Sequence, residues 1–261
     1  MNIGVCFLTT ELKSQNSIVN FIKNSLNNVL NIKNFYKQYH LYTLFETNNI
    51  NSIEDNIIPF NFKQLREKYN IKHKYIQNFR GVCHLPLFYL YDLHPEYDYY
   101  IFYEDDLLYT NFLFENNINP FNNIPFEYYD ITFTYNRIFN PNWYWVKNVS
   151  YNLPKEWTPY EGLLNCYIIS NKALKDLKEF CCNGKWYGHH ELMVNSFFYN
   201  QQDKYKIDLI KNHIPCNIHW LDSKLYQDLF FKELSEYCFV HPIKNDKMLN
   251  YVKRKYNNHI T

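Results

Sequence analysis

The sequence predicts an α/β fold in which helices cover both faces of a mostly parallel sheet. Short runs of strand-favouring residues alternate along the chain with segments whose apolar residues recur at helical spacing, which is typical of parallel sheets with crossover helices. Residues 99–103 form the clearest strand, because all five are apolar or aromatic and no alternation marks an exposed face. The 261 residues contain no Pro-, Gly- or Ser-rich linker, so we expect a single domain over residues 1–261.

The expected elements follow from local patterns along the chain. It opens with a strand at residues 3–8, followed by a helix that Ser14 or Ser17 could cap. One face of this helix is apolar at helical spacing: Ile18, Phe21, Ile22, Leu26, Val29 and Leu30. The other strands are expected at 40–45, 56–59, 99–103, 130–135, 166–169 and 237–240. The other helices are expected at 62–69, from about 83 to 94 with Pro86 near its start, at 171–180 and at 189–199.

Composition bears on the partners and the compartment. A net charge of +1 gives no global reason to expect nucleic acid as a partner. The seven cysteines are an odd number without CxxC or Cys/His ligand spacing, which favours reduced thiols over a disulfide framework or a zinc site. No basic leader is present, and no apolar stretch approaches the roughly 18 residues of a spanning helix. We therefore expect a soluble, cytoplasmic protein without a transmembrane segment.

Three consecutive carboxylates end the buried strand: Glu104, Asp105 and Asp106. The carboxyl ends of parallel strands are where open α/β sheets bind ligands, and adjacent like charges repel unless a cation neutralises them. Oxygen ligands favour Mg²⁺ or Mn²⁺, which usually also contact a substrate's phosphates. A solvated acidic turn is the alternative. Since neither GxGxxG nor GxxxxGK[ST] occurs, a bound metal is left to hold any phosphates.

Residues 94–106, from the His-Pro turn through the strand to the acids, resemble the metal-binding DxD segment of nucleotide-sugar glycosyltransferases of the GT-A fold, with Glu104 in place of the first Asp. Three later segments resemble further landmarks of that family in the expected order. Residues 161–164 are similar to its glycine-containing loop beside the donor sugar. Residues 188–191 resemble the segment that supplies the catalytic acidic residue of inverting members, and residues 239–244 the segment whose histidine completes the metal site.

The resemblance implies roles for individual residues. Asp106 and His241 would bind the metal, and Glu191 would be the catalytic base. The donor nucleotide and sugar would be contacted by Thr9, Thr10, Glu11, Arg80, Glu104, Asp105, Gly162 and Lys244. The acceptor would stack on Trp143, Trp145 and Trp157.

Several of these residues also have a structural alternative. The Thr9–Glu11 groups could cap a loop, Arg80 could be a solvated surface residue, and His241 could be a core histidine. Glu191 could be present only because carboxylates are common in the first turn of a helix. The positive end of the helix dipole also favours the charged form of the carboxylate. At least one of the three tryptophans is expected to pack in the core.

The resemblance as a whole implies an inverting, Mn²⁺- or Mg²⁺-dependent glycosyltransferase. It would move a sugar from a UDP-, GDP- or dTDP-sugar to a hydroxyl of a glycan or glycoconjugate. The nucleotide-binding half would comprise about residues 1–106, and the acceptor-binding half about residues 107–250. Residues 251–261 would form a tail. Lys253, Arg254 and Lys255 of that tail could contact an anionic membrane peripherally or be solvated.

Two other functions remain open from the sequence. A phosphoryl or nucleotidyl transferase would need acids at neighbouring strand ends, and Asp130 begins its strand instead of ending it. A catalytically silent carbohydrate-binding domain could retain the same fold.

Overall fold

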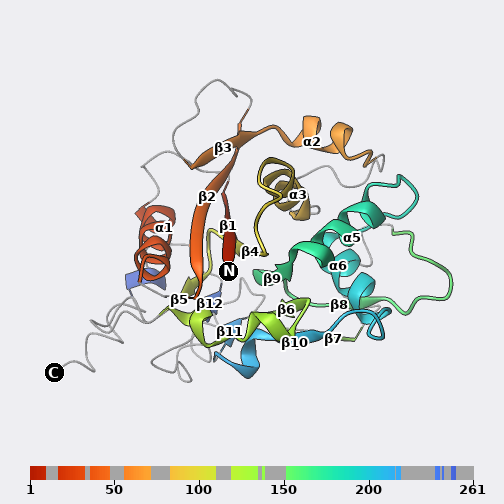
Figure 1. Ribbon diagram of the computed structural model, residues 1–261. Helices are drawn as coiled ribbons and strands as arrows, with labels where there is room; N and C mark the ends of the chain where they lie inside the picture. The colour runs from red at the N-terminus through yellow and green to blue at the C-terminus, as the bar shows by residue number, and fades with distance from the viewer. Residues whose placement is uncertain are drawn as a thin grey trace.

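The computed structural model describes residues 1–9, 17–32, 36–47, 56–71, 83–109, 119–134, 137–138, 151–214, 216–218, 239–241, 243 and 248–250. Their centre is a seven-stranded sheet with the order β10-β6-β9-β4-β1-β2-β3 (Figure 1). The strands are β1 (Asn2–Thr9), β2 (Gln38–Glu46), β3 (Ile57–Phe60), β4 (Tyr99–Glu104), β6 (Ile131–Phe133), β9 (Cys166–Ser170) and β10 (Ile207–Leu209). All neighbouring pairs are parallel except the two that β9 makes, so the predicted mostly parallel sheet is confirmed.

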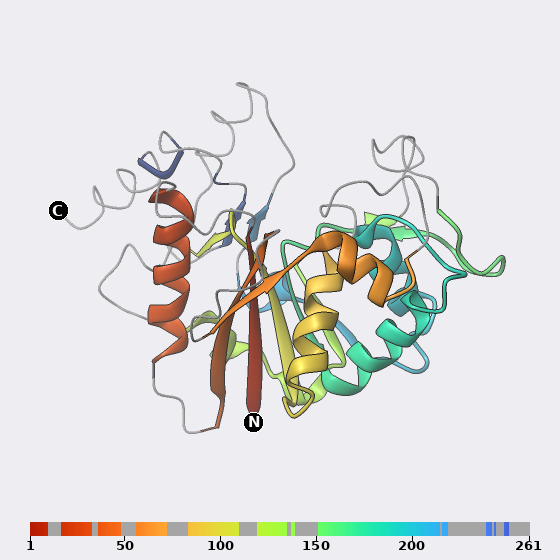
Figure 2. The same ribbon diagram turned by 90° about the horizontal axis from the view of Figure 1, so that it is seen from above.

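Helices cover both faces of this sheet, as predicted (Figure 2). One face packs against α1 (Ser17–Leu30), whose buried residues include Ile18, Ile22 and Leu26. The opposite face packs against α3 (His84–Leu93), α5 (Asn171–Cys181) and α6 (His190–Tyr199). The short α2 (Phe62–Lys68) buries Phe62 and Leu65 in the same cluster. Pro86 lies in the first turn of α3, where a missing N–H leaves no helix hydrogen bond unmade.

Strand β4 is buried on both faces. Tyr100 and Phe102 belong to the hydrophobic cluster under α3, α5 and α6, whereas Ile101 and Tyr103 belong to the cluster under α1. All four side chains are fully buried. By the same alternation, Glu104 follows on the α3 and α6 side, at the carboxyl end of the strand.

Strand β9 runs antiparallel to both of its neighbours, which the sequence did not predict. Its residues Cys166 and Ser170 pair with Tyr103 and Tyr99 of β4. The amino end of β9 therefore lies beside the carboxyl end of β4. As a result, Asn165, just before β9, is placed next to the acidic residues.

Two small sheets complete the described strands. One has the order β11-β12-β5 and consists of β11 (Cys216–Ile218), β12 (Phe239–His241) and β5 (Leu108–Tyr109). The other pairs β7 (Arg137–Ile138) with β8 (Tyr160–Glu161). Short 3₁₀ helices occupy Pro120–Asn123, Phe126–Tyr128 and Ile210–Asn212. Of these elements, the sequence predicted only β12. The others have two to four residues, which is too few to show the spacing of apolar residues that marks a strand or a helix.

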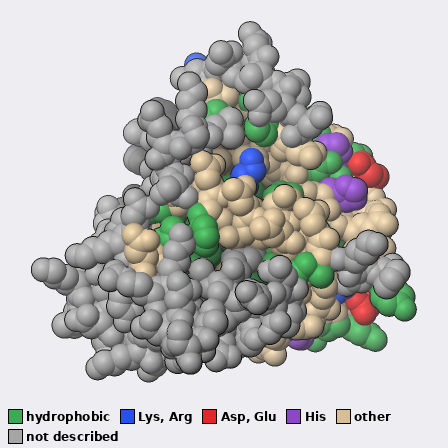
Figure 3. Space-filling view, turned by 90° about the vertical axis from the view of Figure 1, so that its left-hand side faces the viewer, with side chains coloured by type: hydrophobic (Ala, Val, Ile, Leu, Met, Phe, Trp, Pro, Cys, Tyr) green, Lys and Arg blue, Asp and Glu red, His purple; other side chains and the backbone are tan. Residues whose placement is uncertain are grey.

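No cysteine among the described residues forms a disulfide. Within the same residues, no helix has both the length and the apolar character needed to cross a membrane. On the α1 side of the molecule, described histidine and acidic side chains lie together at one edge (Figure 3).

Candidate metal centre

Of the three acids at the end of β4, Asp105 contacts β1, whereas Glu104 and Asp106 both lie beside His241. Asp105 accepts a hydrogen bond of 2.7 Å from Thr9 Oγ1, at the end of the neighbouring strand β1. Asp106 Oδ1 lies 3.1 Å from Nε2 of His241, and Glu104 Oε2 lies 3.7 Å from the same nitrogen. The acids and the histidine therefore converge, although the two segments are far apart in the sequence.

The pairing of β5 with β12 explains how His241 reaches the acids. The chain reverses at Asp105 and Asp106 and enters β5, in which Leu108 pairs with Val240. The next turn of chain is fixed by Ile243 N, which donates to the carbonyl of Asp106 at 2.8 Å. His241 is thereby positioned beside Asp106 by backbone hydrogen bonds, and its side chain is only 7% exposed.

Asn165 connects Glu104 with His241. The sequence did not predict a role for this residue. Its Nδ2 donates to Glu104 Oε2 at 2.8 Å and lies 2.9 Å from His241 Nε2. In this amide orientation Nδ2 can only donate, so the contact is a hydrogen bond when the Nε2 of His241 is unprotonated. An imidazole in this state presents a lone pair at Nε2, which is the form that binds metals.

The donor set fits a divalent cation. Glu104, Asp106 and His241 each offer one ligand atom, and these atoms lie within 4.8 Å of one another. Adjacent ligands of an octahedral Mg²⁺-type ion, each at roughly 2.1 Å, lie about 3 Å apart, which matches the 3.1 Å between Asp106 Oδ1 and His241 Nε2. Burial, and next the charge of Asp106, raise the pKa of Glu104 to about 7. A cation would relieve this repulsion.

Glu191 lies at the start of α6, near these acids. His189 caps the helix by accepting a hydrogen bond from the Glu191 backbone N–H at 3.4 Å. The Glu191 side chain is buried, and within the described residues its Oε2 has no hydrogen-bond partner. Burial raises the pKa of the Glu191 carboxyl well above its usual range, and the negative charge of Glu104 adds to this.

Burial therefore opposes the helix terminus, which favours the charged form of Glu191. A helix dipole contributes about 0.3–1 kcal/mol to an exposed charge, whereas removing a carboxylate from water costs several kcal/mol. The hydrogen bond that Leu164 N–H donates to the carboxyl lowers its pKa but does not outweigh burial.

Gly162 belongs to the buried loop between β8 and β9. Its carbonyl accepts a hydrogen bond of 3.2 Å from Asn195 Nδ2 in α6. This bond ties the loop to the helix that carries Glu191. Its neighbour Glu161 is also buried, and its charge acts on Glu191 as well.

Trp157 packs against Phe180 with ring centroids 4.9 Å apart and belongs to the periphery of the core cluster. Core packing was the alternative to an acceptor contact for this residue. Thr9 orients Asp105, which agrees with its alternative role in the turn. The remaining candidates lie outside the described residues: Thr10, Glu11, Arg80, Trp143, Trp145 and Lys244.

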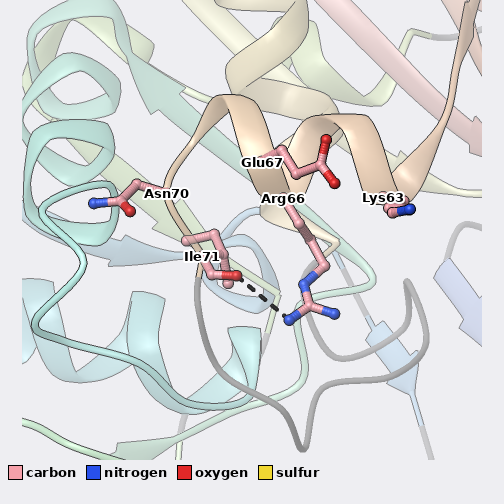
Figure 4. A pocket seen from close by; sticks show the side chains of 5 residues that line it. All are labelled: Lys63, Arg66, Glu67, Asn70 and Ile71. Atoms are coloured by element: carbon pink, nitrogen blue, oxygen red, sulfur yellow. Dashed lines mark hydrogen bonds between the residues drawn. The ribbon is translucent and has the colours of Figure 1, made fainter.

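A pocket of about 340 Å³ lies at α2, and none of the predicted site residues lines it (Figure 4). Its wall is formed by Lys63, Arg66, Glu67, Asn70 and Ile71. Arg66 donates to the carbonyl of Ile71 at 3.4 Å. The pocket is therefore not part of the centre formed by the acids and His241.

Replacing Asn165 by alanine is expected to weaken Mn²⁺ binding by about 10- to 100-fold, the usual effect of removing a group that orients metal ligands. The loss follows because Glu104 and His241 would no longer be held by one amide. Mn²⁺ titration followed by electron paramagnetic resonance measures the affinity. Asn171→Ala is the matched control, since Asn171 follows the far end of β9 and bonds the carbonyls of Pro95 and Tyr97. Equal affinities in the two variants would contradict the assigned role.

No protein-family model and no curated protein matches the chain. Among solved structures it is similar to a glycosyltransferase involved in the glycosylation of the major capsid of PBCV-1, with 10% identity, coverage of 99% of this chain and 98% of that chain, and a TM-score of 0.42. It is also similar to a mutant of Drosophila β1,4-galactosyltransferase 7 in complex with manganese, UDP-Gal and xylobiose. That match has 11% identity, covers 81% of this chain and 66% of that chain, and has a TM-score of 0.39. At such low identities and scores, a functional assignment has to rest on the side chains of this chain.

Proposed function

We propose that the chain is a metal-dependent glycosyltransferase, which moves a sugar from a nucleoside-diphosphate sugar to a hydroxyl of a glycan or glycoconjugate. The observation that carries the proposal is the 3.1 Å approach of His241 Nε2 to Asp106 Oδ1 at the carboxyl end of β4. The resemblance of residues 94–106 and 239–244 to the metal-binding segments of GT-A glycosyltransferases had suggested this pair. The whole chain is proposed as one domain, with the nucleotide bound by its first half.

Asp106 and His241 are the proposed ligands of Mn²⁺ or Mg²⁺, with Glu104 and Asp105 beside the donor. A divalent ion here would neutralise the charge that develops on the departing diphosphate. Thr9 holds Asp105 through its hydroxyl, and Asn165 holds Glu104. The carboxylates are thus oriented by this chain's own hydrogen bonds, which reduces the reorganisation needed when a donor binds.

Glu191 is the proposed base that accepts the proton of the acceptor hydroxyl, which makes the mechanism inverting. A base with a raised pKa accepts a proton strongly once it is ionised. The burial of Glu191 supports this role, and the proximity of its charge to that of Glu104 places both acids in one electrostatic environment. A retaining enzyme would not need this base.

The other proposed contacts follow the sequence. Gly162 would face the donor sugar, and Thr10, Glu11, Arg80 and Lys244 would contact the nucleotide and diphosphate. Trp143 and Trp145 would contact the acceptor, whereas Trp157 packs against Phe180.

The proposal is tested with purified protein, Mn²⁺ and a panel of UDP-, GDP- and dTDP-sugars, with release of nucleoside diphosphate as the measurement. We expect metal-dependent release from at least one donor, faster with a suitable acceptor. Absence of release from every donor, with acceptors present, would count against a glycosyltransferase. Release of inorganic phosphate or nucleoside monophosphate in its place would favour a phosphoryl or nucleotidyl transferase, and nucleotide binding without turnover a silent binding domain.

The position of Asp130 weighs against the phosphoryl-transfer alternative. Its carboxylate accepts hydrogen bonds from Ser170 Oγ at 3.4 Å and Lys206 N at 3.0 Å. Ser170 pairs with Tyr99, at the amino end of β4. Asp130 therefore lies at the opposite end of the sheet from Asp106 and cannot bind a metal together with it.

A further inference from the structure

A second group of metal-ligating side chains lies on the other side of Glu104. Cys83 precedes the first residue of α3, and His190 is the first residue of α6. The Cys83 Sγ, a ring nitrogen of His190 and a carboxylate oxygen of Glu104 all lie within 4.8 Å of one another. Three separate elements of the fold thus bring together a thiol, an imidazole and a carboxylate.

This group is buried and adjoins polar atoms that lack partners. Cys83 is 3% exposed and His190 is 4% exposed. Tyr167 is also buried, and among the described residues its hydroxyl has no hydrogen-bond partner. Cys83 and Glu104 are close enough to Tyr167 that their negative charges, after burial as the main cause, help to raise the pKa of its hydroxyl. A buried hydroxyl without a hydrogen-bond partner costs about 1–3 kcal/mol. A water bound to an ion at this place would give the hydroxyl a partner and remove that cost.

A second buried atom points to the same place. Glu191 Oε2 has no hydrogen-bond partner within the described part of the chain, and Glu191 follows His190 directly. The charge of Glu104 acts on Glu191, so both carboxyls border the same buried region. No Lys or Arg among the described residues forms an ion pair with either.

We propose that Cys83, Glu104 and His190 form a second metal site that takes a borderline-soft divalent cation of the Zn²⁺ class. Sulfur, imidazole nitrogen and carboxylate oxygen are all zinc ligands, and three protein ligands leave a fourth tetrahedral position for water. The thiolate is the form of a cysteine that binds a metal, so binding at Cys83 would release the proton of its thiol.

The two sites differ in chemistry and share one residue. Asp106 and His241 offer only oxygen and nitrogen, which suits Mn²⁺ or Mg²⁺, whereas the thiolate selects for zinc. Glu104 has an oxygen within reach of each group. The site could not be predicted from the sequence, because its ligands lie in three separate segments without the short spacings of zinc motifs. The proposal does not depend on the glycosyltransferase function.

Titration of the metal-free protein with Co²⁺, monitored by absorption, tests the site. Co²⁺ bound to a thiolate gives a sulfur-to-cobalt charge-transfer band in the near ultraviolet, which oxygen and nitrogen ligands do not give. We expect this band to saturate at one equivalent of Co²⁺. It should disappear when Zn²⁺ is added, because a site with a thiolate ligand selects zinc, which would displace the cobalt. Cys83→Ser should abolish the band, because a hydroxyl of similar size replaces the thiolate.

Three controls make the result specific. Cys182→Ser should keep the band, since Cys182 lies at the end of α5 and is near Lys178 and Asp92. Asp106→Asn should also keep it while losing the Mn²⁺ affinity of the first site. Far-ultraviolet circular dichroism checks that Cys83→Ser is folded, and His190→Gln supplies a second ligand variant that should lose the band.

The absence of a charge-transfer band in the wild-type protein would overturn the proposal. Retention of the band in folded Cys83→Ser would do so as well, because another thiol would then be the ligand. Since this readout needs no nucleotide sugar, its failure is distinguishable from failure of the proposed glycosyltransferase function.

Discussion

Asp106→Asn is expected to lower metal-stimulated release of nucleoside diphosphate by on the order of 10³-fold. The carboxylate oxygen nearest to His241 would be replaced by a neutral amide, so the pair could no longer hold a divalent cation firmly. A bound cation contributes several kcal/mol of charge stabilisation, and each 1.36 kcal/mol corresponds to a factor of ten in rate. The measurement is the rate of diphosphate release at saturating Mn²⁺, together with the Mn²⁺ dependence of nucleotide binding.

Asp98→Asn is the matched control for this substitution. Asp98 precedes the amino end of β4 and accepts a hydrogen bond from Asn2 N at 2.7 Å. The Asp98→Asn substitution should leave the rate of diphosphate release unchanged. The metal-free Asp106→Asn protein should be at least as stable thermally as the wild type, because the repulsion between Glu104 and Asp106 is removed. Full activity of Asp106→Asn would exclude Asp106 as a metal ligand.

Glu191→Gln is expected to lower turnover by about 10²- to 10⁴-fold, the usual contribution of a general base, while sparing donor binding. Glutamine has nearly the same shape and can still accept the hydrogen bond from Leu164 N–H, but it cannot take a proton. Calorimetric titration with nucleotide and Mn²⁺ measures binding, and single-turnover transfer measures the chemical step.

Glu179→Gln on the exposed side of α5 is the control and should behave like the wild type. Wild-type turnover in Glu191→Gln would remove Glu191 from the base role. A parallel loss of nucleotide affinity would indicate that Glu191 holds the site together instead of acting in the reaction.

The sequence predicted the large elements because their patterns are local. The unbroken apolar run of β4 and the helical spacing of Ile18, Ile22 and Leu26 in α1 are repeated signals over many residues. The direction of β9 has no such signal, since a buried five-residue strand reads alike in either direction. For that reason Asn165, which lies beside Glu104 only because β9 is antiparallel, could not be anticipated.

In the candidate metal centre, too, some residues were predicted from the sequence, whereas others depend on tertiary packing. Asp106 and His241 were chosen from a resemblance, and they lie 3.1 Å apart. The burial of Glu191 could not be predicted, because the position in a helix is visible in a sequence, whereas the degree of burial depends on the packing of α6 against the rest of the fold. The cluster of Cys83, Glu104 and His190 depends wholly on tertiary packing.

The pairing of β5 with β12 has a thermodynamic consequence for the proposed cation. An ion held by Asp106 and His241 would act as a cross-link between the end of the central strand and a strand close to the end of the chain. Binding that occurs only in the folded state adds about 2.7 kcal/mol of stability at a free concentration of 100 Kd. The docking of β12, and with it the small sheet, would therefore tighten or loosen with the supply of the cation.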